Sequence, residues 1–201
     1  MSRIRVLIAE DEATTRQILA EQISLIGYDV VGQAKDGDEA VALALSLQPD
    51  VGVFDIKMPG RDGLDAAREI MESAPMALLM LTGLYDPELI DRAKDIGVFA
   101  YLVKPANAET LQASIEVALR RFAELQAARQ EACDLKEALE TRKLVERAKG
   151  VLMQRLGLAE ADAFRRLQRE SNNQSRPLKH IAEAILIAEG LFKPAAAVES
   201  E

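Results

Sequence analysis

The first 120 residues alternate between short apolar runs and longer amphipathic stretches. The runs hold four or five residues each and are rich in Val, Ile, Leu or aromatic side chains, as buried parallel strands are: Arg5–Ala9, Tyr28–Gly32, Val51–Phe54, Ala77–Leu81 and Ala100–Val103. Helical patterns lie between them, over residues 13–26, 37–48, 64–74 and 86–96. This alternation predicts an α/β fold that is doubly wound around a five-stranded parallel sheet.

Glycine, proline and polar residues mark the ends of these helices. Gly27 and Gly97 follow two of them, and a Gln-Pro-Asp turn at 48–50 follows another. Asp86 and Pro87 are typical of an N-cap followed by the first helical position. With the flavodoxin-like strand order 2-1-3-4-5, a ligand site is expected at the carboxyl ends of strands 1 and 3.

A long helix is predicted to follow, because residues 108–154 contain no proline and no glycine before Gly150. Its apolar residues recur every three or four positions, a heptad pattern with one irregularity: Leu111, Ile115, Ala118, Phe122, Leu125, Ala128, Ala132, Leu135 and Leu139. A narrow apolar seam of this kind favours a homodimer through a coiled coil. The alternative is that the seam packs against its own chain.

The last part of the chain shows three shorter helical patterns, over residues 140–155, 159–171 and 176–190. Gly157 is expected to end the first, and Ser175 to cap the third, with Pro177 in its first turn. In the second, Phe164 and Leu167 are predicted to face inward. The pattern predicts a small all-α, three-helix domain.

Composition places the chain among globular proteins. Hydrophobic residues make up 49% of its 201 residues, so a packed core is expected. No apolar run approaches the roughly 20 residues of a membrane span, and the N-terminus has no signal-peptide pattern. The single cysteine, Cys133, excludes a disulfide within the chain. These features predict a soluble, cytoplasmic protein with no membrane contact.

Charge is unevenly distributed around a formal net charge of -8. Residues 1–120 hold 11 basic against 20 acidic residues, whereas residues 141–193 hold 11 basic against 6 acidic. A local basic excess in an acidic protein indicates a polyanion partner, although a merely solvated helical surface is the alternative. The candidate polyanion-binding cations are Arg142 and Lys149, predicted to lie away from the apolar face of the first helix, and Arg165, Arg166 and Arg169, predicted to point outward from the second. Arg176 and Lys179, predicted to flank the core of the third helix, complete the set.

The tail offers few aromatic side chains for stacking on unpaired bases. It contains no tryptophan or tyrosine, and Phe164 is predicted to be core. Arginine can stack on bases and pair with phosphates instead. His180 has no cysteine or second histidine nearby, so a metal role is not expected.

Ionisable and hydroxyl side chains follow four of the predicted strands. Strand 1 leads into Glu10 and Asp11, strand 3 into Asp55, strand 4 into Thr82, and strand 5 into Lys104. These strand ends meet at one edge of a parallel sheet. Solvated loop charges are the alternative, but crowded carboxylates beside a lysine fit a site for Mg²⁺ and phosphate.

The chemistry that such a site supports is phosphoryl transfer to the protein itself. Asp55 would attack as a carboxylate nucleophile and form an acyl phosphate, with Mg²⁺ held by Asp11 and Asp55. Lys104 and the Thr82 hydroxyl would hold the phosphoryl oxygens. Hydrolysis of an external substrate is the weaker alternative, because no second acid–base pair is present.

Residues 3–120 resemble the receiver domain of two-component response regulators. The resemblance rests on motifs that occur in order: Glu10-Asp11, Phe54-Asp55-Ile56-Lys57-Met58-Pro59-Gly60, Thr82-Gly83, Tyr101 and Lys104-Pro105. It implies that a histidine kinase phosphorylates Asp55. It also implies a phosphoacceptor that assists its own phosphotransfer and slow dephosphorylation, rather than an enzyme.

The same resemblance implies further roles at the site. The backbone carbonyl of Lys57 would bind Mg²⁺, and the bond before Pro105 would be cis. Thr82 and Tyr101 would move together as a switch, whereas a simple core position is the alternative for Tyr101. Glu10 stands where aspartate is commoner in the family, and its longer side chain would reach the metal through a water molecule.

Residues 139–186 are similar to the ANTAR output domain, a three-helix RNA-binding module of transcription antitermination regulators. The resemblance rests on these residues: Arg142, Ala148-Lys149-Gly150-Val151-Leu152-Met153, Gly157-Leu158, Glu160, Ala163-Phe164 and Ile181-Ala182. Departures occur in the second half, where Leu167-Gln168-Arg169 stands in place of the usual Leu-Arg. The resemblance implies binding to hairpin loops in nascent transcripts.

The predicted organisation is therefore a receiver domain at 1–120, a helical linker or coiled coil at 121–138, an ANTAR-like domain at 139–193 and a flexible tail at 194–201. The leading hypothesis is a phosphorylation-controlled RNA-binding antiterminator. A DNA-binding response regulator is the second. The third is a phosphoryl-carrying regulator that acts only through protein partners.

Overall fold

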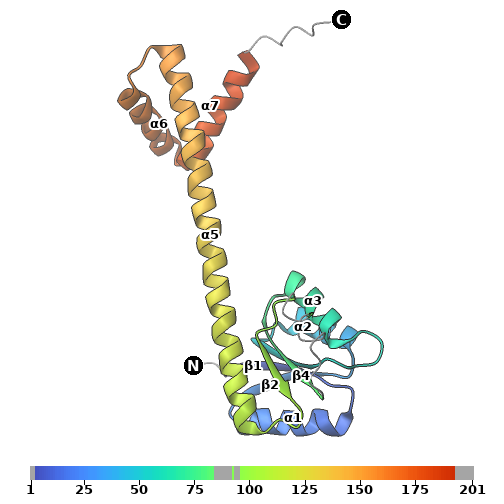
Figure 1. The fold of residues 1–201 in the computed structure, drawn as a ribbon. Coiled ribbons are helices and arrows are strands. Elements are labelled where there is room, and N and C mark those ends of the chain that lie inside the picture. Colours follow the sequence, from blue (N-terminus) through green and yellow to red (C-terminus); the bar gives the residue numbers. More distant parts are fainter. Residues whose placement is uncertain (1–2, 84–91, 93–95, 193–201) are drawn as a thin grey trace, which may run out of the picture. The chain divides into compact units, whose positions relative to one another are not determined.

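The computed structural model describes residues 3–83, 92 and 96–192. The chain divides into two compact units, Met1–Ala127 and Ala128–Glu201, here called the sheet unit and the helical unit. Helix α5 (Ala108–Leu156) begins in the first and continues into the second (Figure 1). The helix predicted at 86–96, with its Asp86 cap, lies outside the described residues except for positions 92 and 96. None of the described helices combines the length and apolar character needed to cross a membrane.

The sheet unit contains the predicted five parallel strands, in the order β2-β1-β3-β4-β5. The strands are β1 (Arg5–Ala9), β2 (Asp29–Ala34), β3 (Val51–Asp55), β4 (Ala77–Thr82) and β5 (Ala100–Val103). The α/β doubly wound fold and its strand order are thus confirmed. Strand β2 extends two residues beyond its predicted end, because it pairs with β1 as far as Ala34.

Helices cover both faces of the sheet. Alternate strand residues face opposite sides, so Leu7 and Phe54 pack under α2 (Gly37–Leu47) and α3 (Gly63–Ser73). Ile8 and Val53 pack under α1 (Ala13–Leu25) and the first turns of α5. The strands are therefore buried on both sides, as their continuous apolar runs predict.

The apolar seam of α5 has two environments. Leu111, Ile115 and Ala118 are fully buried against the sheet, and Phe122 and Leu125 pack against the same cluster. Farther along the helix, Ala128, Ala132, Leu135 and Leu139 are exposed, and Leu135 is 65% exposed. The first half of the seam thus packs against its own chain, as the alternative interpretation holds, while the second half is uncovered.

The helical unit is built from the end of α5 together with α6 (Glu160–Gln174) and α7 (Leu178–Phe192). Val145, Ala148, Leu167, Ile181 and Ala182 form its core. The helix predicted at 140–155 is not separate, because nothing in that stretch interrupts α5 before its end at Leu156.

Two turns separate the helices of this unit. Gly157 adopts a φ of 65° just after α5 and ends it as predicted. The prediction that Ser175 caps the third helix is wrong. Helix α6 continues to Gln174, and Ser175 ends it in the left-handed region with a φ of 50°.

The prediction that Phe164 faces inward is also wrong, since its side chain is 40% exposed. Ala163 and Leu167 are four residues apart and define the buried stripe of α6. Phe164 lies at the edge of that stripe.

Candidate functional site

The carboxyl ends of β1 and β3 bring three acidic side chains together. One carboxylate oxygen from each of Glu10, Asp11 and Asp55 lies within 4.8 Å of the others. Glu10 is 1% exposed and Asp55 is 7% exposed, whereas Asp11 is open to solvent. Because β1 and β3 are neighbours in the sheet, this cluster occupies the expected crevice at the strand ends.

Lys104 provides the positive charge of the cluster. Its Nζ donates to Glu10 Oε2 at 2.6 Å and to Asp55 Oδ2 at 2.7 Å. Its backbone N–H donates to the Thr82 carbonyl at 2.8 Å, and a cis peptide bond joins it to Pro105, as the resemblance implies. The lysine therefore connects the first and third strand ends to the fifth.

Burial and pairing change the pKa values of Glu10 and Lys104. Burial raises the pKa of the Glu10 carboxyl, and the ammonium of Lys104 offsets only part of that rise. Burial lowers the pKa of Lys104, but hydrogen bonds to Asp55 and Glu10 outweigh it and leave that pKa above its usual value. Two buried carboxylates, Glu10 and Asp55, share one ammonium, so a further cation would be favoured here.

The donor set fits a hard divalent cation. The three carboxylates offer oxygen ligands close enough to share one ion, which is the chemistry that Mg²⁺ prefers. Lys57 lies two residues beyond Asp55 on the same loop, and its backbone N–H donates to Asp55 Oδ1 at 3.4 Å. Asp11, Asp55 and Glu10 are therefore the side chains of the described structure that could hold Mg²⁺.

Thr82 and Tyr101 lie on the two strands beyond Asp55. Thr82 is the last residue of β4 and is buried. Strand β4 is the neighbour of β3, which carries Asp55 at its end. Tyr101 is half-buried on β5 and packs against the apolar cluster beneath α2 and α3. The structure thus brings Thr82 to the edge that carries Asp55 and gives Tyr101 a packing role on one face of the sheet.

The sequence interpretation missed two residues that position the cluster. Arg16, on α1, donates from Nη1 to the Glu10 carbonyl at 2.6 Å and to the Asp11 carbonyl at 3.3 Å, which fixes the acidic loop. A cation in the first helical turn after an acidic loop was the available signal. Gly63 begins α3 against the end of β3, where an added Cβ would lie 1.9 Å from the Asp55 carbonyl oxygen.

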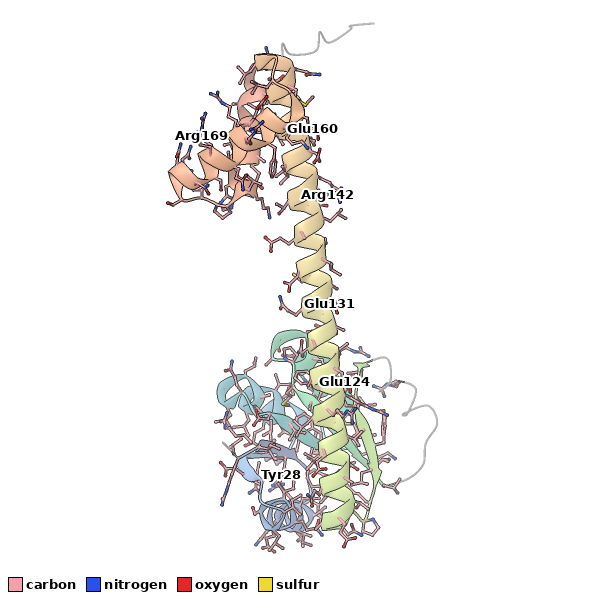
Figure 2. All side chains as sticks on the ribbon, turned by 90° about the vertical axis from the view of Figure 1, so that its left-hand side faces the viewer. Tyr28, Glu124, Glu131, Arg142, Glu160 and Arg169 are labelled. Carbon is pink, nitrogen blue, oxygen red and sulfur yellow. The ribbon has the colours of Figure 1, made fainter. Side chains whose placement is uncertain are left out.

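The cations of the helical unit differ in their environments. Arg142, Arg165, Arg169 and Arg176 are exposed (Figure 2 labels Arg142 and Arg169). Lys179 is partly exposed, with its Nζ 3.5 Å from Glu137 Oε1.

The prediction that Lys149 lies on an outward face is wrong. Lys149 is 8% exposed, and its Nζ donates to Glu146 at 2.9 Å and Glu160 at 2.8 Å. It follows Val145 by four residues, which places both side chains on the same side of α5. The hydrogen bond to Glu160, followed by that to Glu146, raises the pKa of Lys149. The lysine thus ties α5 to the start of α6.

Lys149→Ala should lower the thermal midpoint of the helical unit, because it removes the ammonium that two carboxylates share across α5 and α6. Lys143→Ala is the matched control, since Lys143 is exposed and its ion-pair partner in the described part of the chain, Glu140, lies on its own helix. Calorimetry should show a clear decrease for the first variant and little change for the second. Equal midpoints would contradict the structural role of Lys149.

An arginine-rich surface covers the outer side of α6. This α6 arginine surface consists of Arg165, Arg166 and Arg169, which line a shallow hollow with Gln168 and Asn172. Arg165 pairs with Asp162 at 3.0 Å. Among the described residues, Arg166 and Arg169 form no ion pair, so their guanidinium groups are available to a polyanion.

The doubly wound fold and the acidic cluster with its lysine define a response regulator receiver domain. A family model described as "Response regulator receiver domain" matches residues 6–116, and one described as "ANTAR domain" matches residues 134–186. The chain belongs to the response regulators that join a receiver domain to an ANTAR domain.

Individual proteins agree with this membership. The chain is 48% identical over 182 residues to the transcriptional regulatory protein PdtaR of Mycobacterium tuberculosis, covering 90% of this chain and 89% of that protein. The probable transcriptional regulator ycf27 of Guillardia theta is 41% identical over 117 residues, covering 58% of this chain and 46% of that protein. The signal receiver domain of a modulated diguanylate cyclase from Desulfovibrio desulfuricans has a TM-score of 0.58 and 36% identity, covering 61% of this chain and 98% of that one. Of these three similarities, the one to PdtaR extends over both units of the chain.

Proposed function

We propose that this protein is a phosphorylation-controlled RNA-binding regulator that acts in transcription antitermination. A histidine kinase phosphorylates Asp55, and the helical unit binds hairpins in transcripts. The observation that carries the phosphoacceptor role is the position of Asp55, nearly buried between the acidic pair and the ammonium of Lys104. Membership of the ANTAR family and the α6 arginine surface support the RNA-binding role.

The phosphoryl transfer uses groups that converge on Asp55. A carboxylate oxygen of Asp55 forms a bond to phosphorus while the bond from phosphorus to the donor's imidazole nitrogen breaks in line with it. Lys104 then pairs with a phosphoryl oxygen in place of the Asp55 carboxylate, and the Thr82 hydroxyl donates to another. Asp11, Asp55 and the Lys57 carbonyl would hold Mg²⁺, which would compensate the negative charge of the phosphoryl oxygens.

RNA binding follows from charge and accessibility. Arg166 and Arg169 have no ion pair among the described residues, and Arg165 lies beside them on α6. Guanidinium groups pair with phosphates through two hydrogen bonds. In this proposal Arg142, Arg176 and Lys179 extend the contact surface, while Lys149 contributes through the fold of the unit.

An electrophoretic mobility assay tests the proposal as a whole. The full-length protein is incubated with loop-randomised hairpin RNA or with a matched DNA duplex, with and without acetyl phosphate and Mg²⁺. Binding to hairpin RNA that changes on phosphorylation supports the proposal. Preference for the duplex would support a DNA-binding regulator, and binding to neither would support a regulator that acts through protein partners.

The uncovered half of the α5 seam supports a second copy of the chain as partner. Leu135 and Leu139 are exposed on the same side of the helix as Ala128 and Ala132, which is the spacing that a coiled coil buries. We propose that phosphorylation increases pairing through this stretch.

Replacing both Leu135 and Leu139 by Asp should keep the protein monomeric with or without phosphoryl donor, because the pair would place charge in the seam. Sedimentation of the wild type should show a larger dimer fraction after phosphorylation. Ala123→Asp, at an exposed position on the opposite side of α5 from the seam, is the control and should sediment as the wild type does. An unchanged balance in all samples would remove the seam as a dimer interface.

A further inference from the structure

Phe164 forms part of a groove in the helical unit. The groove lies between α5, α6 and the start of α7, and its lining includes Arg142, Phe164, Pro177, Lys179 and His180. Phe164 is 40% exposed, whereas its neighbour Ala163 is fully buried. Phe164 does not belong to the apolar cluster that forms the core of the unit. Its ring is therefore a solvent-exposed wall of the groove.

The acidic residues of the groove are already engaged. Asp134 accepts a hydrogen bond from Gln130 at 2.8 Å, and Glu146 accepts one from Lys149 at 2.9 Å. Glu137 lies 3.5 Å from the ammonium of Lys179. Glu137 and Glu146 thus have cationic partners, whereas Asp134, whose partner is a neutral amide, keeps its charge at the α5 side of the groove.

Arg142 is the cation of the groove that remains available. Its side chain is exposed on α5 (Figure 2). No ion pair joins it to a residue that the structure describes. A planar apolar ring and an unpaired guanidinium in one groove suit a ligand with a flat apolar face and an anionic group. An unpaired nucleotide has both features, since its base stacks on aromatic rings and its phosphate pairs with arginine.

We propose that this groove holds one unpaired base of an RNA loop, stacked on Phe164, with Arg142 donating to the phosphate of the same nucleotide. The proposal rests on the RNA-binding function proposed above and assigns it a base subsite. Bases within a duplex are stacked on one another and cannot reach the ring, so the subsite distinguishes a loop from a paired stem. The α6 arginine surface, by contrast, provides charge that serves loop and stem alike.

The test uses the full-length protein and hairpin RNAs selected by the wild type from a loop-randomised stem–loop library. Phe164→Leu should weaken hairpin binding by about tenfold, as expected for one lost base stack, and should leave the affinity for the blunt-ended stem duplex unchanged. Phe164→Tyr retains a ring and should bind as the wild type does. Ile187→Ala is the control and should bind hairpin RNA as the wild type does, because Ile187 is an exposed apolar residue of α7 outside this groove.

Arg142→Ala tests the phosphate contact separately from the base stacking on Phe164. It should reduce the slope of log affinity against log salt by about 0.7 to 0.9, the value for one phosphate contact, whereas Phe164→Leu should leave that slope unchanged. The fluorescence of a 2-aminopurine base placed in the loop should change on binding to the wild type, whereas binding of Phe164→Leu should leave it close to that of the free hairpin.

The possible outcomes separate failure of the Phe164 base subsite from failure of the proposed RNA-binding function. If the wild type recovers no hairpin from the library, RNA binding and the subsite both fail. If the wild type binds hairpins and Phe164→Leu binds them equally well, only the subsite is overturned. Equal losses on hairpin and duplex by a folded Phe164→Leu protein would also overturn it, because a base stack acts on the loop alone.

Discussion

Asp55→Asn takes up no phosphoryl group when incubated with acetyl phosphate and Mg²⁺, while the wild type gains one per chain. The amide has nearly the shape of the carboxylate but is a poor nucleophile, and Asp55 is the only one of the three clustered acids on β3. Lys104 keeps its contact with Glu10 in this variant, so the loop after β5 retains a partner at the strand ends. Intact-mass spectrometry measures the added phosphoryl group directly.

Asp29→Asn is the matched control, because it makes the same change at an exposed position at the start of β2. It should be phosphorylated at the wild-type rate. Matching far-UV circular dichroism spectra for all three proteins would establish that each is folded. Phosphorylation of Asp55→Asn at the wild-type rate would transfer the acceptor role to another residue.

Gly63→Ala should destabilise the sheet unit and impair phosphorylation together. The added methyl group would lie 1.9 Å from the carbonyl oxygen of Asp55, and neither α3 nor β3 can yield without moving buried backbone. Overpacking of this kind typically costs about 1 to 3 kcal/mol. The displaced carbonyl belongs to the phosphoacceptor itself, so the rate of phosphoryl uptake should fall in the fraction that folds.

Gly83→Ala is the control for this change in the same unit, since an added Cβ there meets nothing within 4 Å. Urea denaturation should give a lower free energy of unfolding for Gly63→Ala and a nearly unchanged one for Gly83→Ala. A Gly63→Ala protein as stable as the wild type would mean that the start of α3 can shift away from β3 without cost.

Much of the sheet unit could be predicted because its signals are local. Short apolar runs define the strands, and parallel strands necessarily bring their carboxyl ends to one edge. That rule alone placed Glu10, Asp55 and Lys104 together, and the structure gives contacts of 2.6 and 2.7 Å between them. Arg16 and Gly63 were missed because their importance depends on the exact approach of α1 and α3 to that edge.

The helical unit was harder to predict, because its details depend on contacts between helices. The environment of Lys149 is set by Glu160, which arrives from α6 after a turn. Phe164 lies beside the buried stripe of its helix, and periodicity does not assign such a border position to either side. The α5 seam showed a heptad pattern from Leu111 to Leu139 with one irregularity, yet among the described residues the part from Leu111 to Leu125 packs in the sheet unit and the rest is exposed.

The exposed middle of α5 has a consequence for local stability. Every residue from 127 to 140 is exposed, so these turns bury no side chain, and the pair of Glu137 with Lys179 is a solvent-exposed contact. A helical stretch of about this length is marginal in water and depends on intrinsic propensity and on pairs such as Gln130 with Asp134. Its amide hydrogens should therefore exchange with solvent through local fraying, well before those of the strands. Any partner that covers Leu135 and Leu139 would convert this stretch from the fastest-exchanging part of α5 into a protected one.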